Sequence, residues 1–457
     1  MNWNPQLIRT IPECAWPGFM GGDGAARLAS LFQLEQSQWL DPETITARQL
    51  HQAAGVLRHA AQTIPFYRAR FQEAGFDPHA PLTPAHWLHL PILSRADVQL
   101  AGPKLLSPSI PKQHGNINWT QTSGSTGQPV RVATTSLVNH FWCAFTLRDH
   151  QWSQRDFQGK LAVLRASPNP ASPPQPTTSP SWGIATHGLY QTGPSVSLDI
   201  SANVSDQVAW LKRENPDYLL TYPSNLLALT NHCLHHGITL PNLKDVRAVG
   251  EIVTPAMREN CKQAWGVPLI DTYSSQEFGY IALQCHEHGQ MHIQSENVLV
   301  EILDADDQPC APGQTGRLVI TSLHNFATPL IRYEIGDHAT VGPPCACGRG
   351  LPVLAEILGR TRNMLVFESG EQRWPNVGML RFRDIAPVQQ CQTIQKSHTQ
   401  LHVRLVVETP LTHTQEEKLI ALIQSSLGFP FEIELEYLPE IPRSKSGKYE
   451  VFLCEVS

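Results

Sequence analysis

Short apolar runs and amphipathic stretches alternate along the chain from about residue 160 onward. The run "DYLLTYPS" at 217–224 predicts a buried strand that leaves into a turn, and "NLLALTNHCLHHG" after it predicts a helix that ends at Gly237. The same succession follows at once, since "VRAVGEIV" predicts a strand and "TPAMRENCKQAWG" predicts a helix. Strands that alternate with helices in this way are typical of α/β layers, so we expect an α/β fold.

The helix predicted in "TPAMRENCKQAWG" has recognisable boundary residues. Thr254 can cap its N-terminus, Pro255 suits its first position, and Gly266 suits its end. The strand "VPLIDTY" comes next, at 267–273, and leaves through the polar segment "SSQE". Because ligands bind outside the carboxyl ends of strands in open α/β sheets, this exit is a candidate functional position.

Two segments depart from the pattern. Residues 166–182 contain six prolines among small polar residues, so we expect a surface loop without regular structure there. After residue 360 come a strand, "QLHVRLVVE", a helix, "THTQEEKLIALIQSSLG", which ends at Gly428, and a strand, "FEIELEYL". We therefore predict a large N-terminal domain of packed sheets and helices at residues 1–361 and a small C-terminal α+β domain at residues 362–457.

Composition narrows the class of protein. A chain of 457 residues with a net charge of −6 offers no basic surface for nucleic acid and no polybasic patch for a membrane. Its N-terminus lacks a basic region followed by an apolar run, and no apolar window is long enough to span a membrane. Ten cysteines in so long a chain are too sparse for a disulfide framework. We expect a cytoplasmic protein whose partners are small molecules or other proteins.

The segment "WTQTSGSTGQP" at 119–129 gathers hydroxyl side chains and glycines. Glycines let the backbone approach a ligand closely, and the hydroxyl and N–H groups are donors for an anion such as phosphate. The same composition is typical of an ordinary surface turn. It is not a Walker A loop, because Gln128 and Pro129 stand where that motif needs its lysine.

Four further segments carry candidate chemistry: "TYSSQEFGY", "LIRYEIGDHA", "LGRTRN" and "IPRSKSGKYEV". They supply an aromatic ring followed by an acid, a Gly-Asp pair, an arginine beside a glycine, and a lysine in a late Gly-rich loop. Taken singly, each is more simply explained as a cap acid, a turn residue, a surface cation or a tail charge. Their joint order along the chain is the informative feature.

In this order the five segments resemble the motifs of the adenylate-forming superfamily, and most closely those of the phenylacetate–CoA ligases and their relatives. The resemblance covers nearly the whole chain. It implies a ligase that uses ATP and Mg²⁺ to form an acyl adenylate, with a C-terminal domain that moves about a hinge near residue 362. The implied phosphate loop consists of Thr122, Ser123, Gly124, Ser125, Thr126 and Gly127. The other implied roles are Tyr273 with Ser274 at the nucleotide base, Glu277 at Mg²⁺, Asp337 at the ribose hydroxyls, Arg360 at ribose or phosphate, and Lys448 between the carboxylate and the α-phosphate.

Cysteines outside the apolar segments form a second pattern. "CHEHGQMH" supplies Cys285 and His288, and "CACG" supplies Cys345 and Cys347. Three thiolates and one imidazole are a usual ligand set for a structural zinc ion. The resemblance strengthens this expectation, since relatives in this branch carry the same spacing. His286 and His292 are alternatives for the nitrogen ligand.

The chain departs from its relatives near the hinge. They have Gly-Arg-x-Asp-Asp, whereas Arg362 and Asn363 occupy the last two positions here, and "FESGEQRWPN" replaces the segment that lines the pantetheine channel. The acceptor is therefore open between CoA, a carrier-protein phosphopantetheine and an amine, and a catalytically silent nucleotide-binding scaffold is the alternative of another class. A homodimer is also left open. Candidates for the carboxylic acid pocket, which suggest an aromatic or apolar acid, are Phe141, Tyr222, Pro223, Gly250 and Glu251.

Overall fold

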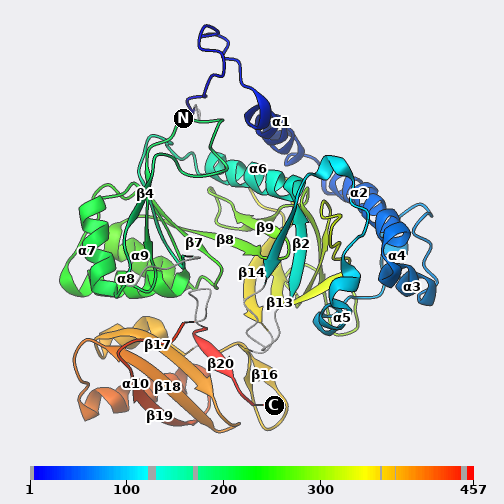
Figure 1. Cartoon of the computed structure of the whole chain (residues 1–457). Helices are drawn as coiled ribbons and strands as arrows, with labels where there is room; N and C mark the ends of the chain where they lie inside the picture. Colours follow the sequence, from blue (N-terminus) through cyan, green and yellow to red (C-terminus); the bar gives the residue numbers. More distant parts are fainter. Residues whose placement is uncertain are drawn as a thin grey trace. The chain divides into compact units, whose positions relative to one another are not determined.

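The computed structural model describes residues 5–121, 130–167, 173–360, 363–375, 377–443 and 450–456 (Figure 1). The chain divides into two compact units. Unit 1 consists of Met1–Gln158, Ser181–Gly193 and Thr272–Leu358. Unit 2 consists of Gly159–Pro180, Pro194–Asp271 and Gly359–Ser457.

Unit 1 begins with helices. They are α1 (Gly22–Ser37), α2 (Pro42–Thr63), α3 (Pro65–Glu73), α4 (Pro84–Trp87), α5 (Arg95–Ala101) and α6 (Ser136–Trp152), with 3₁₀ turns η1 (Gly102–Leu105) and η2 (Lys112–His114). Helix α2 begins at Pro42 because the Asp41 carboxylate accepts a hydrogen bond from the Thr44 backbone N–H at 2.8 Å, and proline suits the first helical position. Helix α5 begins with a complete capping box between Ser94 and Asp97.

The sheet strands of unit 1 follow the order β11–β12–β13–β14–β10–β9–β8. Their bounds are β8 (Leu269–Ser275), β9 (Gly279–Gln284), β10 (Met291–Ile293), β11 (Val298–Leu303), β12 (Thr315–Ser322), β13 (Tyr333–Val341) and β14 (Val353–Arg360). A separate antiparallel pair is formed by β1 (Ile117–Gln121) and β2 (Arg131–Thr135). The main core of the unit packs side chains of α2, α3 and α5 against these strands, with Val56, Leu93 and Ile281 completely buried.

The central part of unit 2 is a mostly parallel sheet in the order β7–β6–β3–β5–β4. The strands are β3 (Leu161–Arg165), β4 (Thr177–Ser179), β5 (Ser195–Asp199), β6 (Tyr218–Thr221) and β7 (Asp245–Val249). Parallel strands need crossover connections, and here α7 (Val204–Glu214) connects β5 to β6 and α8 (Pro223–His236) connects β6 to β7. Helix α9 (Pro255–Trp265) follows β7. These strands and helices share one apolar core.

The last part of unit 2 has an apolar core of its own. Its elements are β15 (Leu365–Val366), β16 (Gln372–Arg373), η4 (Met379–Asp384), β17 (Val388–Gln395), β18 (Gln400–Val407), α10 (His413–Leu427), β19 (Glu432–Tyr437) and β20 (Phe452–Cys454). Four of its strands form a sheet in the order β19–β18–β17–β20. This is the predicted α+β arrangement. The predicted boundary between residues 361 and 362 stays a prediction, because unit 2 groups this part with the parallel sheet.

The predicted α/β fold is confirmed, and so are several helix ends. Thr254 caps α9, Pro255 begins it, and Gly266 ends it in the left-handed conformation, as Gly237 and Gly428 end α8 and α10. Two local predictions differ from the structure in part. The strand expected in "VRAVGEIV" is present as β7, but it ends at Val249, because Gly250 adopts φ +82°. The proline-rich segment contains β4, which pairs antiparallel with β5 along a row without proline. In the described part of the chain, no helix is long and apolar enough to cross a membrane.

Candidate nucleotide and metal sites

Tyr273 and Asp337, the predicted base and ribose residues, lie beside each other in unit 1. The Tyr273 hydroxyl donates a hydrogen bond to Oδ2 of Asp337 at 2.7 Å. Asp337 lies in a bulge of β13, because Arg317 pairs with His338 and Val319 pairs with Glu334, which leaves extra residues opposite Leu318. Gly336 permits the bulge by adopting φ +88°. The Gly-Asp pair therefore turns a carboxylate from the strand toward the tyrosine.

Glu277, the predicted Mg²⁺ ligand, lies in the turn that joins β8 to β9. Its side chain is 8% exposed, and the turn closes through the antiparallel pairing of Ser275 with Gly279. The hydroxyl of Thr120 on β1 donates to the backbone oxygen of Gln276 in the same turn at 3.3 Å. The end of β1, which directly precedes the predicted phosphate loop in sequence, therefore lies beside the Glu277 turn.

Two central predictions lie outside the described residues. They are the phosphate loop, Thr122 to Gly127, and Lys448. The roles assigned to both stay predictions. Arg360 is half-buried and is the last residue of β14, and Ser274 is part of β8 next to Tyr273.

Two of the predicted acid-pocket residues begin α8 in unit 2, and two more follow β7, from which Glu251 contacts the helix. Tyr222 is the N-cap residue and Pro223 begins the helix, while Glu251 accepts a hydrogen bond from the Ser224 backbone N–H at 2.8 Å. Gly250 gives the positive φ that brings this carboxylate to the helix N-terminus, where the helix dipole favours it. The fifth candidate, Phe141, belongs to α6 of unit 1 and stacks on His324 with ring centroids 4.0 Å apart.

Sequence reasoning missed Arg443 as a neighbour of this cluster. Its guanidinium donates to the Ser224 hydroxyl at 3.2 Å. Arg443 directly precedes the segment that contains Lys448, so the described chain leads into that segment beside the start of α8. Nothing in the sequence indicated this contact, because the two residues are far apart along the chain.

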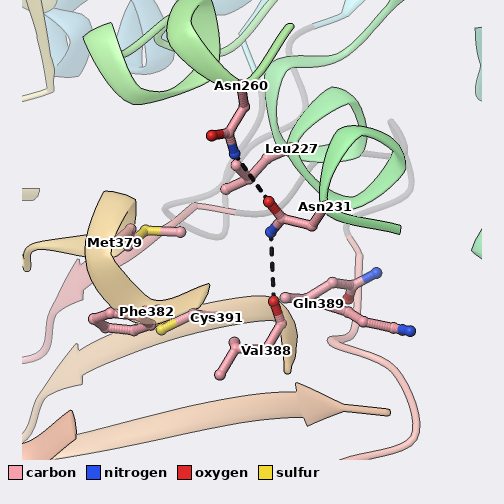
Figure 2. Close-up of a pocket in the computed structure, with 9 residues that line it drawn as sticks. Leu227, Asn231, Asn260, Met379, Phe382, Val388, Gln389 and Cys391 are labelled. Carbon is pink, nitrogen blue, oxygen red and sulfur yellow. Dashed lines mark hydrogen bonds between the residues drawn. The ribbon is translucent and has the colours of Figure 1, made fainter. Parts of the chain in front are cut away.

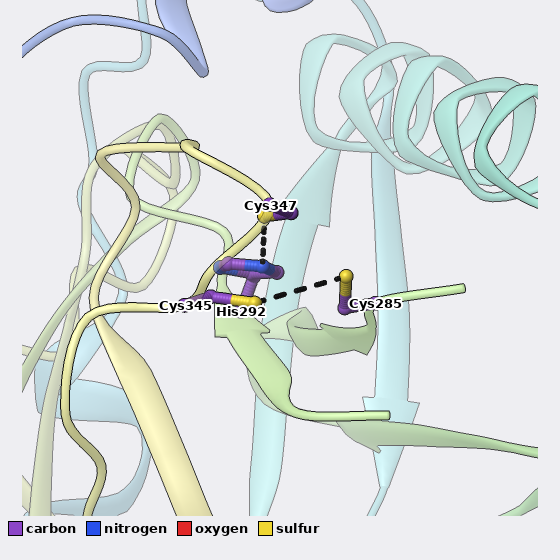
Figure 3. A group of neighbouring side chains, drawn as sticks. All are labelled: Cys285, His292, Cys345 and Cys347. Carbon is purple, nitrogen blue, oxygen red and sulfur yellow. Dashed lines mark hydrogen bonds between the residues drawn. The ribbon is translucent and has the colours of Figure 1, made fainter. Parts of the chain in front are cut away.

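Cys285, His292, Cys345 and Cys347 gather into one group in unit 1 (Figure 3). Their four ligand atoms all lie within 4.8 Å of one another. The sulfurs of Cys285 and Cys345 are 3.9 Å apart, and Sγ of Cys347 is 3.3 Å from Nε2 of His292. Ligand atoms on a tetrahedral zinc ion with bonds of about 2.0–2.3 Å are separated by roughly 3.5 Å, so the group has nearly the size of a zinc site.

The surroundings of this group suit a metal ion. Burial lowers the pKa of His292 to about 4, so the imidazole is neutral, and its Nδ1 faces the Leu351 carbonyl oxygen at 3.3 Å, which leaves Nε2 toward the sulfurs. Burial raises the pKa of Cys345 to about 12. Burial also opposes ionisation of Cys347, but hydrogen bonds from Arg349 to its sulfur outweigh it and lower the pKa of that thiol. Cys347 therefore ionises more readily than an ordinary cysteine, and a bound cation would stabilise its thiolate.

His288 was predicted as the nitrogen ligand, and the structure brings His292 into the group instead. Cys285 and Gln290 close a tight turn through a backbone hydrogen bond of 2.7 Å, so His286 and His288 are exposed at its tip. His292 pairs with Leu283 across β10 and β9 and is completely buried. Among the described residues, the group of possible ligands around Cys285 does not include His288.

Arg349 is a second residue that the sequence did not single out. Its Nε donates to Oε1 of Gln38 at 2.9 Å, and its guanidinium lies 4.9 Å from the Trp39 ring and 4.7 Å from the Trp152 ring. Since it also donates to Cys347, it connects the cysteine loop to the segment between α1 and α2 and to α6. A metal in the cysteine group would therefore stabilise these contacts too.

Comparison with known proteins finds one domain family and several phenylacetate-coenzyme A ligases that resemble this chain. Residues 380–454 match the family model of the CapK C-terminal domain. The phenylacetate-coenzyme A ligase of Thermus thermophilus is 24% identical over 445 residues, covering 90% of this chain and 96% of that protein. The phenylacetate-coenzyme A ligase of Escherichia coli K12 is also 24% identical over 445 residues, covering 92% of this chain and 97% of that protein.

The solved structures that resemble this chain include CoA ligases as well. A structure of 2-hydroxyisobutyryl-CoA ligase in the postadenylation state superposes with a TM-score of 0.69 at 18% identity, over 90% of this chain and 89% of that chain. The same enzyme with 2-HIB-AMP and CoA, in the thioesterification state, superposes with a TM-score of 0.58 at 19% identity, over 90% and 89%. The chain therefore has the fold of the adenylate-forming ligases. Along most of its length its sequence is similar to the phenylacetate-coenzyme A ligases.

Proposed function

We propose that this chain is an ATP-dependent acid–thiol ligase. It activates an aromatic or apolar carboxylic acid as an acyl adenylate and transfers the acyl group to CoA or to a phosphopantetheine thiol. The observation that carries the proposal is the arrangement in unit 1 of the Tyr273–Asp337 pair and of the Glu277 turn joined to the strand that enters the phosphate loop. Full-length relatives named as coenzyme A ligases support a thiol acceptor over an amine and over a silent scaffold.

In the first half-reaction the acid carboxylate attacks the α-phosphorus of ATP. A bond forms between the carboxylate oxygen and phosphorus, the bond to the β-phosphate oxygen breaks, and pyrophosphate leaves. Two anions meet in this step, so Lys448 would offset their repulsion and Glu277 would hold the Mg²⁺ that neutralises the phosphates. In the second half-reaction a thiol loses its proton and attacks the acyl carbon, and AMP leaves.

The cysteine group has a structural role in this proposal. Cys285, His292, Cys345 and Cys347 would hold one zinc ion, since three thiolates and a neutral imidazole fill its four positions and leave none for a substrate. The ion would fix the turn after β9 and the loop before β14. Both adjoin strands of the unit 1 sheet.

Acid-dependent exchange of labelled pyrophosphate into ATP tests the adenylation step. We expect exchange with at least one aromatic or apolar acid, a decrease in kcat of at least about 100-fold in Lys448→Ala, and a smaller effect in the control Lys445→Ala. Absence of exchange with every acid of a broad panel would overturn the proposal. Unchanged exchange in a folded Lys448→Ala variant would assign the role to another cation.

A carrier-protein thiol is a second candidate acceptor, favoured by the segment after the hinge. Arg373 is its cation, and its Nε is 2.5 Å from Oε1 of Glu371, so its charge is already paired on an exposed surface that also carries Glu368. Such a surface does little to attract the 3′-phosphate of free CoA, whereas a tethered phosphopantetheine does not need that contact. Parallel assays of transfer to CoA and to holo carrier proteins decide between them. Transfer to CoA alone would exclude the carrier.

A further inference from the structure

Two histidines at the end of α8 face one carboxylate from the C-terminal part of unit 2. His235 and His236 belong to the last turn of α8, and Glu408 directly follows β18. Nε2 of His236 is 2.8 Å from Oε1 of Glu408, and Nε2 of His235 is 3.4 Å from Oε2 of the same side chain. The three ligand atoms all lie within 4.8 Å of one another and are accessible to solvent.

We propose that His235, His236 and Glu408 form a second divalent-metal site, separate from the cysteine group. Imidazole and carboxylate together suit zinc and its first-row neighbours such as nickel and cobalt. With metal–ligand bonds of about 2.0–2.2 Å, neighbouring ligand atoms lie roughly 3.3 Å apart, which is close to the separations of Glu408 from the two imidazoles. Small side-chain rotations would complete the geometry, and water would occupy the remaining positions.

The position of this group at a helix end favours a cation. Helix α8 ends at Gly237, and its last carbonyl oxygens give the C-terminus a partial negative charge. A divalent ion there would interact favourably with both rings, the carboxylate and the helix end.

His232 adds a third imidazole one turn earlier on the same face. Its ring centroid is 4.4 Å from that of His236, and its buried Nδ1 has no hydrogen-bond partner within the described chain. Three imidazoles therefore lie on the last two turns of α8.

The site would join the parallel-sheet part of unit 2 to its C-terminal part. Figure 2 shows the neighbouring contact, where Asn260 donates to Asn231 at 2.9 Å and Asn231 donates to the Val388 carbonyl oxygen at 3.4 Å. A small pocket lies among these residues, Met379 and Phe382, so packing there is incomplete. A metal bound by α8 and Glu408 would cross-link the two parts at this contact. If the proposed function holds, such a cross-link would also slow the domain movement between adenylation and acyl transfer.

Metal titration of the untagged protein tests the site without ATP, acid or acceptor. With the cysteine group already loaded with zinc, calorimetry with added zinc should show one further equivalent. The double variant His235→Ala/His236→Ala and the variant Glu408→Gln should each weaken that binding at least about tenfold. The control is His413→Ala, which removes another exposed histidine, 3.3 Å from Glu417 on α10, and should keep the second equivalent.

The outcomes separate this proposal from the proposed function. No second equivalent in the wild type, or one that persists in both ligand variants, would overturn the metal site. If the wild type binds the second equivalent but shows no pyrophosphate exchange, the metal site is supported and the proposed ligase activity is contradicted. In an active enzyme, saturating metal should lower the rate of complete thioester formation in the wild type and not in His235→Ala/His236→Ala. An equal effect of metal in both would overturn the cross-link.

Discussion

A single hydrogen bond joins Tyr273 to Asp337, although the strands that carry them are well separated in the chain. The bulge at Gly336 creates this pair, because it turns Asp337 out of the regular alternation of β13. In the proposed function the carboxylate would accept hydrogen bonds from the ribose hydroxyls while the tyrosine holds its orientation. The two side chains should therefore contribute unequally to nucleotide binding.

Replacing Asp337 by Asn should raise KM for ATP and lower kcat/KM for pyrophosphate exchange about 10- to 100-fold, because hydrogen bonds to an ionised acceptor are the stronger ones. Tyr273→Phe removes only the hydroxyl and keeps the ring, so we expect a smaller loss. Steady-state exchange kinetics of both variants measure this difference. Equal and minor effects would show that Asp337 does not contact the ribose.

Single substitutions can also show whether His292 or His288 is the nitrogen ligand of the cysteine group. His292→Ala and Cys345→Ser should each release zinc and lower the melting temperature, because a structural metal contributes directly to folding free energy. His288→Ala should keep one zinc per chain, since that side chain is exposed at the turn tip. Elemental analysis after dialysis against a weak chelator, combined with thermal unfolding, measures both. Zinc loss in His288→Ala with retention in His292→Ala would reverse the assignment.

At the scale of elements, two helical glycines have opposite surroundings. A Cβ on Gly24 of α1 would collide with the backbone carbonyl oxygen of Gly188, which cannot move aside as a side chain would. A Cβ on Gly55 of α2 would meet open space. The same substitution should therefore have opposite effects on stability at the two positions.

Gly24→Ala should lower the free energy of unfolding by about 1–3 kcal/mol, because the helix must shift away from the loop at Gly188. Gly55→Ala should raise it by about 0.5–1 kcal/mol, since alanine reduces the entropy of the unfolded chain without strain. Urea unfolding midpoints of the two variants provide the comparison. A change of the same sign in both would contradict the geometry.

Helix ends could be predicted from the sequence because caps act locally. Thr254, Pro255 and Gly266 determine the bounds of α9 within the segment itself. The two local errors concern features that do not depend on the local sequence pattern alone. Strand β4 forms because it pairs with β5, and strand β7 ends where Gly250 adopts a positive φ. Propensity alone contains neither piece of information.

At the scale of the whole molecule, the alternation of predicted strands and helices was enough to predict the α/β class of fold. The contacts between distant segments were not predictable in this way. The spacing of Cys285 and His288 suggested a short chelate, but the tight turn exposes His288 and the pairing of β10 with β9 buries His292. Arg443 beside Ser224 and Glu408 beside His236 likewise depend on packing across long separations in sequence.

Partly or fully buried histidines should make the stability of the fold depend on pH. Burial lowers the pKa of a set of imidazoles away from the cysteine group: His59, His114, His140, His150, His324 and His338. Their rings stay neutral in the folded protein at a pH where the unfolded chain, with an ordinary histidine pKa of about 6.5, already takes up protons. This contribution to stability is complete above about pH 6.5 and is lost as the pH falls toward the folded pKa values.

The free energy of unfolding should therefore decrease between pH 7.5 and pH 5.5, by up to about 1.4 kcal/mol per pH unit for each extra proton that the unfolded chain binds. The carboxylates of Asp199 and Glu296 do not contribute to this pH range, because the pKa of each is lowered and both take up protons only below it. Urea unfolding at several pH values, with zinc present in excess, measures the slope. His150→Phe should make the slope shallower because His150 is buried, whereas the exposed His413→Gln should leave it unchanged. A stability that is constant or rises as the pH falls would contradict the prediction.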